Sequence, residues 1–312
     1  MYAFVFPGQG AQVVGMGREI YDASSAAREV FEEVSDTLGL NLTRMIFEGP
    51  MEDLTLTVNA QPALMTVSLA LMRALEKEAG FHLADKASYV AGHSLGEYSA
   101  LCAAGGYSLK DTAQLLAIRG RAMQEAVPVG TGAMAALLGA DLEQAEAITR
   151  AAIDGDICEV ANDNAPGQVV ISGHKSAVER AIEIAKERGI KRALLLPVSA
   201  PFHCSLMEPA AVVMQTALSR MSISPLAAPL IANVTADVVA DAGEIPVLLV
   251  RQVTGRVRWT ETVQRLKSLG VTNILEVGAG KVLTGLIKRI EPELTCYALN
   301  GPEDIDAFLR LS

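Results

Sequence analysis

The chain has 312 residues, 50% of them hydrophobic, with a net charge of −10 and a pI near 5.0. Its acidity argues against nucleic acid or an anionic membrane as the main partner, and its length allows one large domain with an insertion or two modest domains. The four cysteines form no C-x-x-C pair, so we expect no metal site and a reducing, cytoplasmic location. No stretch is long enough for a membrane span, and residues 2–6 are too short for the apolar part of a secretion signal.

The first part of the chain alternates between strand and helix patterns. Ser108 and Asp111 form a variant of the capping box, which predicts that a helix begins at Leu109. Upstream of that helix we predict a strand over 2–6, helices around 27–38 and 62–79, a strand over 88–91 and a helix over 97–104.

A different order of elements follows between residues 132 and 196. The pattern predicts a strand over 132–138, a helix over 142–152, strands over 158–162 and 168–173, a helix over 175–188 and a strand over 191–196. This β-α-β-β-α-β order is typical of ferredoxin-like units, and proline and glycine at both ends mark its boundaries.

The α/β alternation resumes after Pro201, with a strand over 272–277 and a helix over 281–291. We therefore predict an α/β fold in which residues 1–127 and 198–312 form a large, discontinuous, α/β-hydrolase-like domain with a mostly parallel sheet. Residues 128–197 are predicted to form the inserted ferredoxin-like small domain.

The segment SYVAGHSLG, residues 88–96, fits the G-x-S-x-G pattern of a nucleophile elbow. Gly92 and Gly96 flank Ser94, and a Cβ at either position would clash where the strand and the following helix approach each other. Ser94 would lie at the positive end of a helix, with the N–H of Leu95 free to hold an oxyanion. The pattern alone is only moderately specific, and its strand–turn–helix setting supports it.

A serine nucleophile needs a base within hydrogen-bond reach, and the chain has only four histidines. His93 should point away from Ser94 and brace the turn, while His82 and His174 have the pattern of surface residues. His203 remains, on an irregular segment between a predicted strand and a helix, where catalytic groups are often presented.

These features, with FPGQGAQ near the start, resemble the malonyl-CoA:acyl carrier protein transacylases of fatty-acid synthesis. The resemblance extends from end to end, with two departures. Arg256 stands where the family usually has a proline, and Ala279 stands where Gly-Pro-Gly is common. The matching stretches are FPGQGAQ (6–12), GHSLGEYSAL (92–101), RGRAMQEAVP (119–128), NDNAPGQVVISG (162–173), SAPFHCSLM (199–207), RQVTGRVRW (251–259) and GAGKVLTGLIKRI (278–290).

The resemblance implies ping-pong transfer of a malonyl group from malonyl-CoA to the phosphopantetheine thiol of acyl carrier protein, through a malonyl ester of Ser94. It also implies that His203 is the general base and that the backbone carbonyl of Gln252 orients it, because no acidic residue stands in a clear triad position. The N–H groups of Gln9 and Leu95 are implied to hold the oxyanion.

Arg119 is the residue expected to select malonyl, because a guanidinium can hold a carboxylate through two parallel hydrogen bonds. Arg121 points to another face of the same helix. By resemblance, Asn162 lies near the cleft for CoA and pantetheine, and the ring of Phe202 would crowd a branched acyl group. The expected substrate-binding residues are Arg119, Met123, Asn162, Phe202 and His93.

Two alternatives share some of these features. A serine esterase or thioesterase of the α/β-hydrolase type would have the same elbow, but the inserted unit, the missing acidic triad member and Arg119 argue against it. A carrier-docking subunit without activity would not need the serine, histidine and arginine together. We expect no cofactor and a monomer, and we expect acyl carrier protein to dock on a basic patch with Lys288, Arg289 and, as a further candidate, Lys281.

Overall fold

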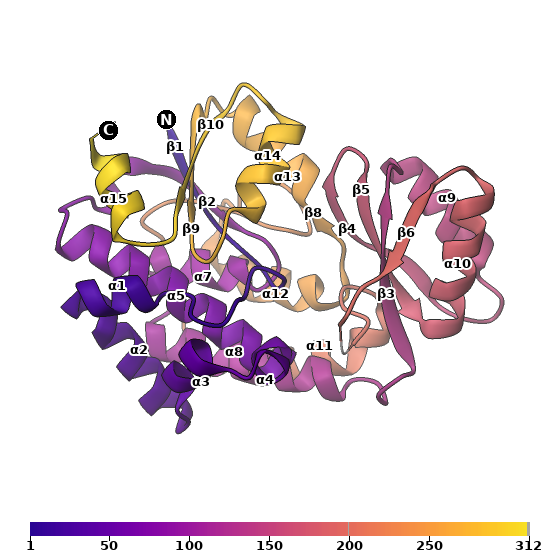
Figure 1. Cartoon of the computed structure of the whole chain (residues 1–312), viewed down its shortest axis with the longest axis horizontal. Helices are drawn as coiled ribbons and strands as arrows, with labels where there is room; N and C mark the ends of the chain where they lie inside the picture. Colours follow the sequence, from indigo (N-terminus) through magenta and orange to yellow (C-terminus); the bar gives the residue numbers. More distant parts are fainter. Residues whose placement is uncertain (199, 311–312) are drawn as a thin grey trace.

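The computed structural model describes residues 1–198 and 200–310, and it contains two five-stranded sheets that lie side by side (Figure 1). Ser199, the first residue of the SAPFHCSLM stretch, lies outside the described residues, as do residues 311 and 312. In the described part of the chain, none of the helices combines the length and apolar character that crossing a membrane requires.

The first sheet is parallel throughout, in the order β10-β9-β1-β2-β7. Its alternate residues face two cores: Phe4 and Phe6 pack with helices on one face, while Ala3 and Val5 pack with helices on the other. The strands are β1 (Tyr2–Phe6), β2 (Ala87–Gly92), β7 (Leu230–Ile231), β9 (Asn273–Val277) and β10 (Thr295–Leu299).

Helices cover both faces of the parallel sheet, with α13 and α14 on the face opposite to α5, α7 and α8 (Figure 1). The helices before the inserted segment are α1 (Arg18–Ala23), α2 (Ser25–Leu38), α3 (Leu42–Glu48), α4 (Met51–Thr55), α5 (Thr57–Lys77), α6 (Leu83–Lys86), α7 (Gly96–Ala103) and α8 (Leu109–Glu125). Those after it are α11 (Glu208–Leu218), α12 (Ile245–Thr254), α13 (Trp259–Ser268), α14 (Val282–Ile290) and α15 (Pro302–Leu309).

The second sheet has the order β6-β3-β5-β4-β8, and helices α9 (Leu142–Ala152) and α10 (Lys175–Glu187) share one apolar core with it. Its strands are β3 (Gly132–Leu138), β4 (Cys158–Ala165), β5 (Gln168–His174), β6 (Arg192–Leu195) and β8 (Val257–Arg258). The first four are antiparallel, whereas β8 comes from later in the chain and pairs in parallel with β4. The predicted α/β fold class is confirmed, with a smaller subdomain built on a mixed sheet; the division of the chain at residues 128 and 197 stays a prediction.

Helix α5 begins at Thr57, five residues before the predicted start at Pro62. The carbonyl of Leu56 accepts hydrogen bonds from the N–H groups of Asn59 and Ala60, which form a first turn upstream of the proline. Pro62 cannot donate a backbone hydrogen bond, but α5 is buried against α2 and α8, and such packing outweighs one missing bond.

Candidate active site

The turn between β2 and α7 holds Ser94 in a left-handed conformation, with φ 54°. A Cβ on Gly92 would lie 1.9 Å from the carbonyl oxygen of Gly96, and a Cβ on Gly96 would lie 2.2 Å from that of Phe6. Glycine at both positions therefore allows the helix to approach the strand closely enough to form a nucleophile elbow, as the sequence predicts.

His203 lies next to this serine, with its Nε2 atom 2.7 Å from Ser94 Oγ. Its Nδ1 atom is 2.9 Å from the carbonyl oxygen of Gln252 and 3.1 Å from that of Gly255. Because carbonyl oxygens only accept hydrogen bonds, Nδ1 carries the proton and Nε2 is free to accept one from the serine. Burial, followed by the positive charge of Arg119, lowers the pKa of His203 to about 3, which keeps the imidazole neutral.

The Arg119 side chain, only 1% exposed, extends from α8 to the serine. Nη1 donates to Gln61 Oε1 at 2.7 Å, and Nη2 donates to Gln252 Oε1 at 2.8 Å and to Ser94 Oγ at 3.2 Å. Burial lowers the pKa of Arg119, yet a guanidinium keeps its proton in proteins. None of the described carboxylates forms an ion pair with it. A buried cation without a carboxylate partner beside a nucleophile favours an acidic substrate.

Gln9 and Leu95 lie on the loop after β1 and in the elbow turn. Within the described ranges, no hydrogen bond to the backbone N–H of either residue is seen, so both donors are free for a ligand. The side chain of Gln9 is fixed separately, because its Oε1 atom accepts a hydrogen bond from Thr57 Oγ1 at 2.9 Å.

Met123, Phe202 and Asn162 are all buried. The sulfur of Met123 contacts Gln61 Nε2 at 3.7 Å, so it supports the amide that binds Arg119. Phe202 directly precedes His203 and packs in the main core. Asn162 lies in β4, and its side chain makes no hydrogen bond with any described residue.

His93 connects the elbow to the smaller subdomain. Its Nε2 atom is 2.7 Å from Asn164 Oδ1, and its ring lies 5.6 Å from that of Trp259, centre to centre. Burial lowers the pKa of His93, so the ring is neutral. The surface interpretation holds for the exposed His82, and His174 is partly exposed at the point where β5 ends and α10 begins. Its Nδ1 atom accepts a hydrogen bond from the N–H of Ile157 at 2.9 Å.

Sequence reasoning missed three polar residues that complete the site. The side chain of Gln61 accepts a hydrogen bond from Arg119. Asn233 accepts a hydrogen bond from the N–H of Ser94 at 2.8 Å, and Glu97 accepts one from Gln252 Nε2 at 2.7 Å. Of the three, Glu97 is the one that the sequence could have revealed, because it directly follows the elbow motif in a stretch that is otherwise apolar or small. The other two carry no local signal.

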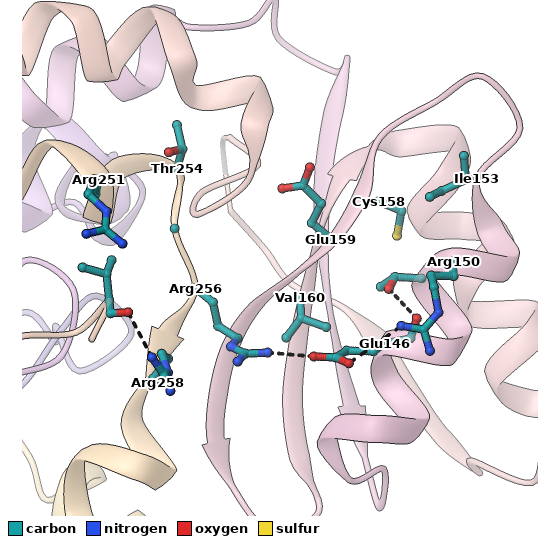
Figure 2. Close-up of a pocket in the computed structure, with 13 residues that line it drawn as sticks. Glu146, Arg150, Ile153, Cys158, Glu159, Val160, Arg251, Thr254, Arg256 and Arg258 are labelled. Carbon is teal, nitrogen blue, oxygen red and sulfur yellow. Dashed lines mark hydrogen bonds and ion pairs between the residues drawn. The ribbon is translucent and has the colours of Figure 1, made fainter. Parts of the chain in front are cut away.

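A pocket of about 700 Å³ lies between α9 and β4 on one side and the segment joining α12 to β8 on the other (Figure 2). Arg256, the residue that replaces a usual proline, crosses it: its Nη1 atom lies 2.9 Å from Glu146 Oε1 (Figure 2). Gly255, whose carbonyl binds His203, also lines the pocket, whereas Ser94, His203 and Arg119 do not. Ala279, the second departure, is buried in the main core.

A serine in an elbow, a neutral histidine bonded to it and a parallel α/β sheet are together the features of a serine-dependent acyltransferase. Over residues 3–285 the chain matches the family described as acyl transferase domain. It is 47% identical over 309 residues to the malonyl CoA-acyl carrier protein transacylase of Bacillus subtilis (strain 168), a match that covers 99% of this chain and 96% of that protein.

Solved structures agree with this match. An acyl-carrier-protein-S-malonyltransferase from Bartonella henselae is similar with a TM-score of 0.97 and 53% identity, covering 99% of this chain and 98% of that one. A malonyl-transacylase in complex with its type II PKS acyl-carrier protein is similar with a TM-score of 0.96 and 42% identity, covering 100% and 99% of the two chains. The chain belongs to the malonyl CoA-acyl carrier protein transacylases.

Proposed function

We propose that Ser94, His203 and Arg119 carry out the transfer of a malonyl group from malonyl-CoA to the phosphopantetheine thiol of acyl carrier protein, a step of fatty-acid synthesis. Family membership and the relatives' activity support the reaction, and the geometry of the three side chains supports their roles.

In the first half-reaction, His203 Nε2 takes the proton of Ser94 Oγ, and Oγ attacks the thioester carbonyl carbon of malonyl-CoA. The free N–H groups of Gln9 and Leu95 hold the oxyanion of the tetrahedral intermediate. When the intermediate collapses, the carbon–sulfur bond breaks and His203 returns the proton to CoA sulfur, leaving malonyl on the serine.

The second half-reaction reverses these steps with a different thiol. The phosphopantetheine thiol gives its proton to His203 Nε2 and attacks the malonyl ester; Ser94 then leaves with that proton. The carbonyl oxygens of Gln252 and Gly255 keep Nδ1 protonated throughout, so the same nitrogen serves both half-reactions.

The observation that carries the substrate assignment is the 3.2 Å contact between Arg119 Nη2 and Ser94 Oγ. A malonyl thioester has its carboxylate two bonds from the reacting carbonyl carbon, so both groups can be bound at once at such a separation. The carboxylate would also supply the negative charge that the buried guanidinium lacks.

The test uses intact-protein mass spectrometry after mixing with malonyl-CoA and then with acyl carrier protein. We expect a mass gain of one malonyl group that passes to the carrier, no gain for Ser94→Ala, and severely slowed gain for His203→Ala. Labelled Ser94→Ala would show that the elbow assignment is wrong. A label lost to water instead of to the carrier would favour the serine esterase or thioesterase alternative.

We further propose that the protein works as a cytoplasmic monomer on an acyl carrier protein. The serine, histidine, arginine and glutamine of the site all come from one chain, so no second copy is needed to complete it. All four cysteines are free thiols, in keeping with a reducing compartment. Sedimentation at working concentration tests the monomer.

A further inference from the structure

Glu97 is a buried carboxylate behind the nucleophile, and the proposed chemistry does not use it. It lies in the first turn of α7 and is 1% exposed. The helix dipole alone favours an acidic residue in the first turn, but an exposed side chain would gain that stabilisation without the free-energy cost of burying a carboxylate. Its Oε2 atom instead accepts two hydrogen bonds from outside α7, from Gln252 Nε2 at 2.7 Å and from the backbone N–H of Asn233 at 3.2 Å.

Both partners of Glu97 hold the nucleophile or the arginine. Gln252 Nε2 also donates to the carbonyl oxygen of Ser94 at 2.9 Å, while its Oε1 atom accepts from Arg119 Nη2 at 2.8 Å. Asn233 accepts the N–H of Ser94 through Oδ1 and donates to the carbonyl oxygen of Gly92 at 2.6 Å. The peptide groups on both sides of the nucleophile are thus held by two side-chain amides.

The carboxylate fixes which way the Gln252 amide faces. If that amide were rotated by 180°, its oxygen would meet Glu97 Oε2 and the carbonyl of Ser94, and its NH₂ group would meet the guanidinium of Arg119. Each of these contacts pairs an acceptor with an acceptor or a donor with a donor, and unsatisfied groups in a buried site are costly. Without Glu97, only the Ser94 carbonyl would hold the NH₂ end.

Burial and the neighbouring groups shift the pKa of Glu97 in opposite directions. Burial raises the pKa of Glu97 to about 7, while its hydrogen bonds to Gln252 and Asn233 and the charge of Arg119 act in the opposite direction. Oε1, the other carboxylate oxygen, has no partner among the described residues, so it can carry a proton while Oε2 continues to accept.

We propose that Glu97 is a positioning residue for acyl-group selection: it orients the Gln252 amide so that its oxygen holds the Arg119 guanidinium against Ser94. The inference rests on the proposed function, in which Arg119 binds the malonyl carboxylate. Glu97 touches neither acyl group nor CoA in this role, and its effect on acyl selection passes through Gln252.

The test compares Glu97→Leu, Glu97→Gln and Glu97→Asp by kcat/KM for malonyl-CoA and for acetyl-CoA. Leucine removes the acceptor, so we expect the malonyl-to-acetyl ratio to fall about tenfold, mainly through a higher malonyl KM, the size typical of one buried hydrogen bond. Glutamine can still accept with its oxygen and should keep the ratio within about threefold. Aspartate keeps the charge, but its shorter side chain cannot reach Gln252, so we expect the same fall in the ratio as with leucine. Glu97→Asp therefore takes the place of Glu97→Leu if the leucine variant does not fold.

Two controls separate this role from others. Glu143→Leu removes an exposed first-turn glutamate from α9 and should change neither rate. In an Arg119→Ala background, Glu97→Leu should cause no further loss of the ratio, because its effect passes through the arginine.

An unchanged ratio in Glu97→Leu and Glu97→Asp, or an equal fall for both donors, would overturn the proposal. A glutamine variant as poor as leucine would also overturn it, since charge and not orientation would then matter. If Arg119→Ala itself leaves the ratio unchanged, the proposed role of Arg119 fails instead, and the two failures are thereby distinguished.

Discussion

Arg119 is bound by three neutral acceptors and by no carboxylate among the described residues, which makes it the residue that most directly links structure to substrate. In Arg119→Ala the malonyl carboxylate would be left unpaired in a partly dry site, and we expect malonyl transfer to lose about 2–5 kcal/mol of transition-state binding. Acetyl has no carboxylate, so its transfer should stay equal or improve. The measurement is kcat/KM for both acyl-CoA donors.

Arg119→Lys should restore only part of the malonyl rate, because an ammonium group keeps the charge but lacks the two parallel donors. Arg121→Ala is the matched control: this arginine is exposed on the same helix and should affect neither donor. A parallel fall for malonyl and acetyl in Arg119→Ala would mean that the arginine supports the fold or binds CoA.

The lowered pKa of His203 predicts the pH dependence of loading. Burial and the charge of Arg119 hold this pKa at about 3, so the base stays neutral and active as pH falls through about 6.5, the value of an ordinary histidine. Rapid-quench measurement of malonyl loading should therefore show no loss with a midpoint near 6.5. Glu97→Gln is measured in parallel, because Glu97, with a pKa of about 7, titrates in the same range. An inflection near 6.5 in both proteins would contradict the prediction.

The lowered pKa of His203 also makes the stability of the fold depend on pH, and the linkage between protonation and folding fixes the direction of that dependence. The unfolded chain binds a proton at this histidine below about pH 6.5, and the folded chain does so only near pH 3. His203 therefore stabilises the fold above about pH 6.5, and this contribution is lost as pH falls from there toward 3.

Arg256 connects two elements that the sequence separates widely. It lies between α12 and β8, and Glu146, its partner at 2.9 Å, lies on α9. Both side chains are partly exposed, at 27% and 41%, so the pair should contribute only about 0.2–1 kcal/mol in a double-mutant cycle of urea unfolding, and less at high salt. The Arg150–Glu146 pair, at 3.8 Å within one helix, should show a smaller coupling. Equal couplings for the two pairs would contradict this.

At the level of elements, the inserted part of the smaller subdomain could be predicted to within about a residue at each boundary, except that β4 extends to Ala165, past the predicted end at residue 162. Its strands and helices follow one another in the β-α-β-β-α-β order, and Asp141 with Gln144 forms a full capping box at the start of α9. Helix α5 was mispredicted at its start because a proline inside a helix is a weak guide when tertiary packing dominates. The two-residue strand β8 gave no signal, since its partner β4 lies about a hundred residues away in sequence.

Among the site residues, too, some could be predicted from the sequence and others could not. Ser94 was found from the spacing of glycines, which local sterics impose, and His203 by elimination among four histidines. The bonds among Gln61, Gln252 and Arg119 join segments 58 to 133 residues apart, so no local pattern could reveal them. For Gln252 the resemblance pointed to the backbone carbonyl, and the structure adds a second contact through the side chain.

On the scale of the whole molecule, an enzyme with a net charge of −10 must meet an acyl carrier protein that is expected to be acidic as well. Long-range repulsion opposes that encounter unless a basic surface is presented locally. Of the predicted patch, Lys281 and Lys288 are exposed and have no ion-pair partner in the described part of the chain. Arg289 differs, because it binds Gln168 Oε1 and the carbonyl oxygen of Pro166, both at 2.7 Å, and so joins α14 to the turn after β4.

Lys288 therefore gives the clearer test of docking, since Arg289→Glu would also break contacts within the protein. We expect Lys288→Glu to raise KM for the carrier severalfold at low salt and to leave malonyl loading of Ser94 unchanged, because local charge acts on encounter with the carrier and not on the acyl pocket. The difference from wild type should shrink above about 0.5 M salt, where exposed charges are screened.

Lys110→Glu, on the exposed side of α8, makes the same change in net charge away from the patch and serves as the control. If Lys110→Glu raises the carrier KM as much as Lys288→Glu does, net charge alone governs the encounter and α14 is not the docking surface. If Lys288→Glu slows both half-reactions equally, the lysine supports the acyl site instead, because docking of the carrier concerns only the second half-reaction.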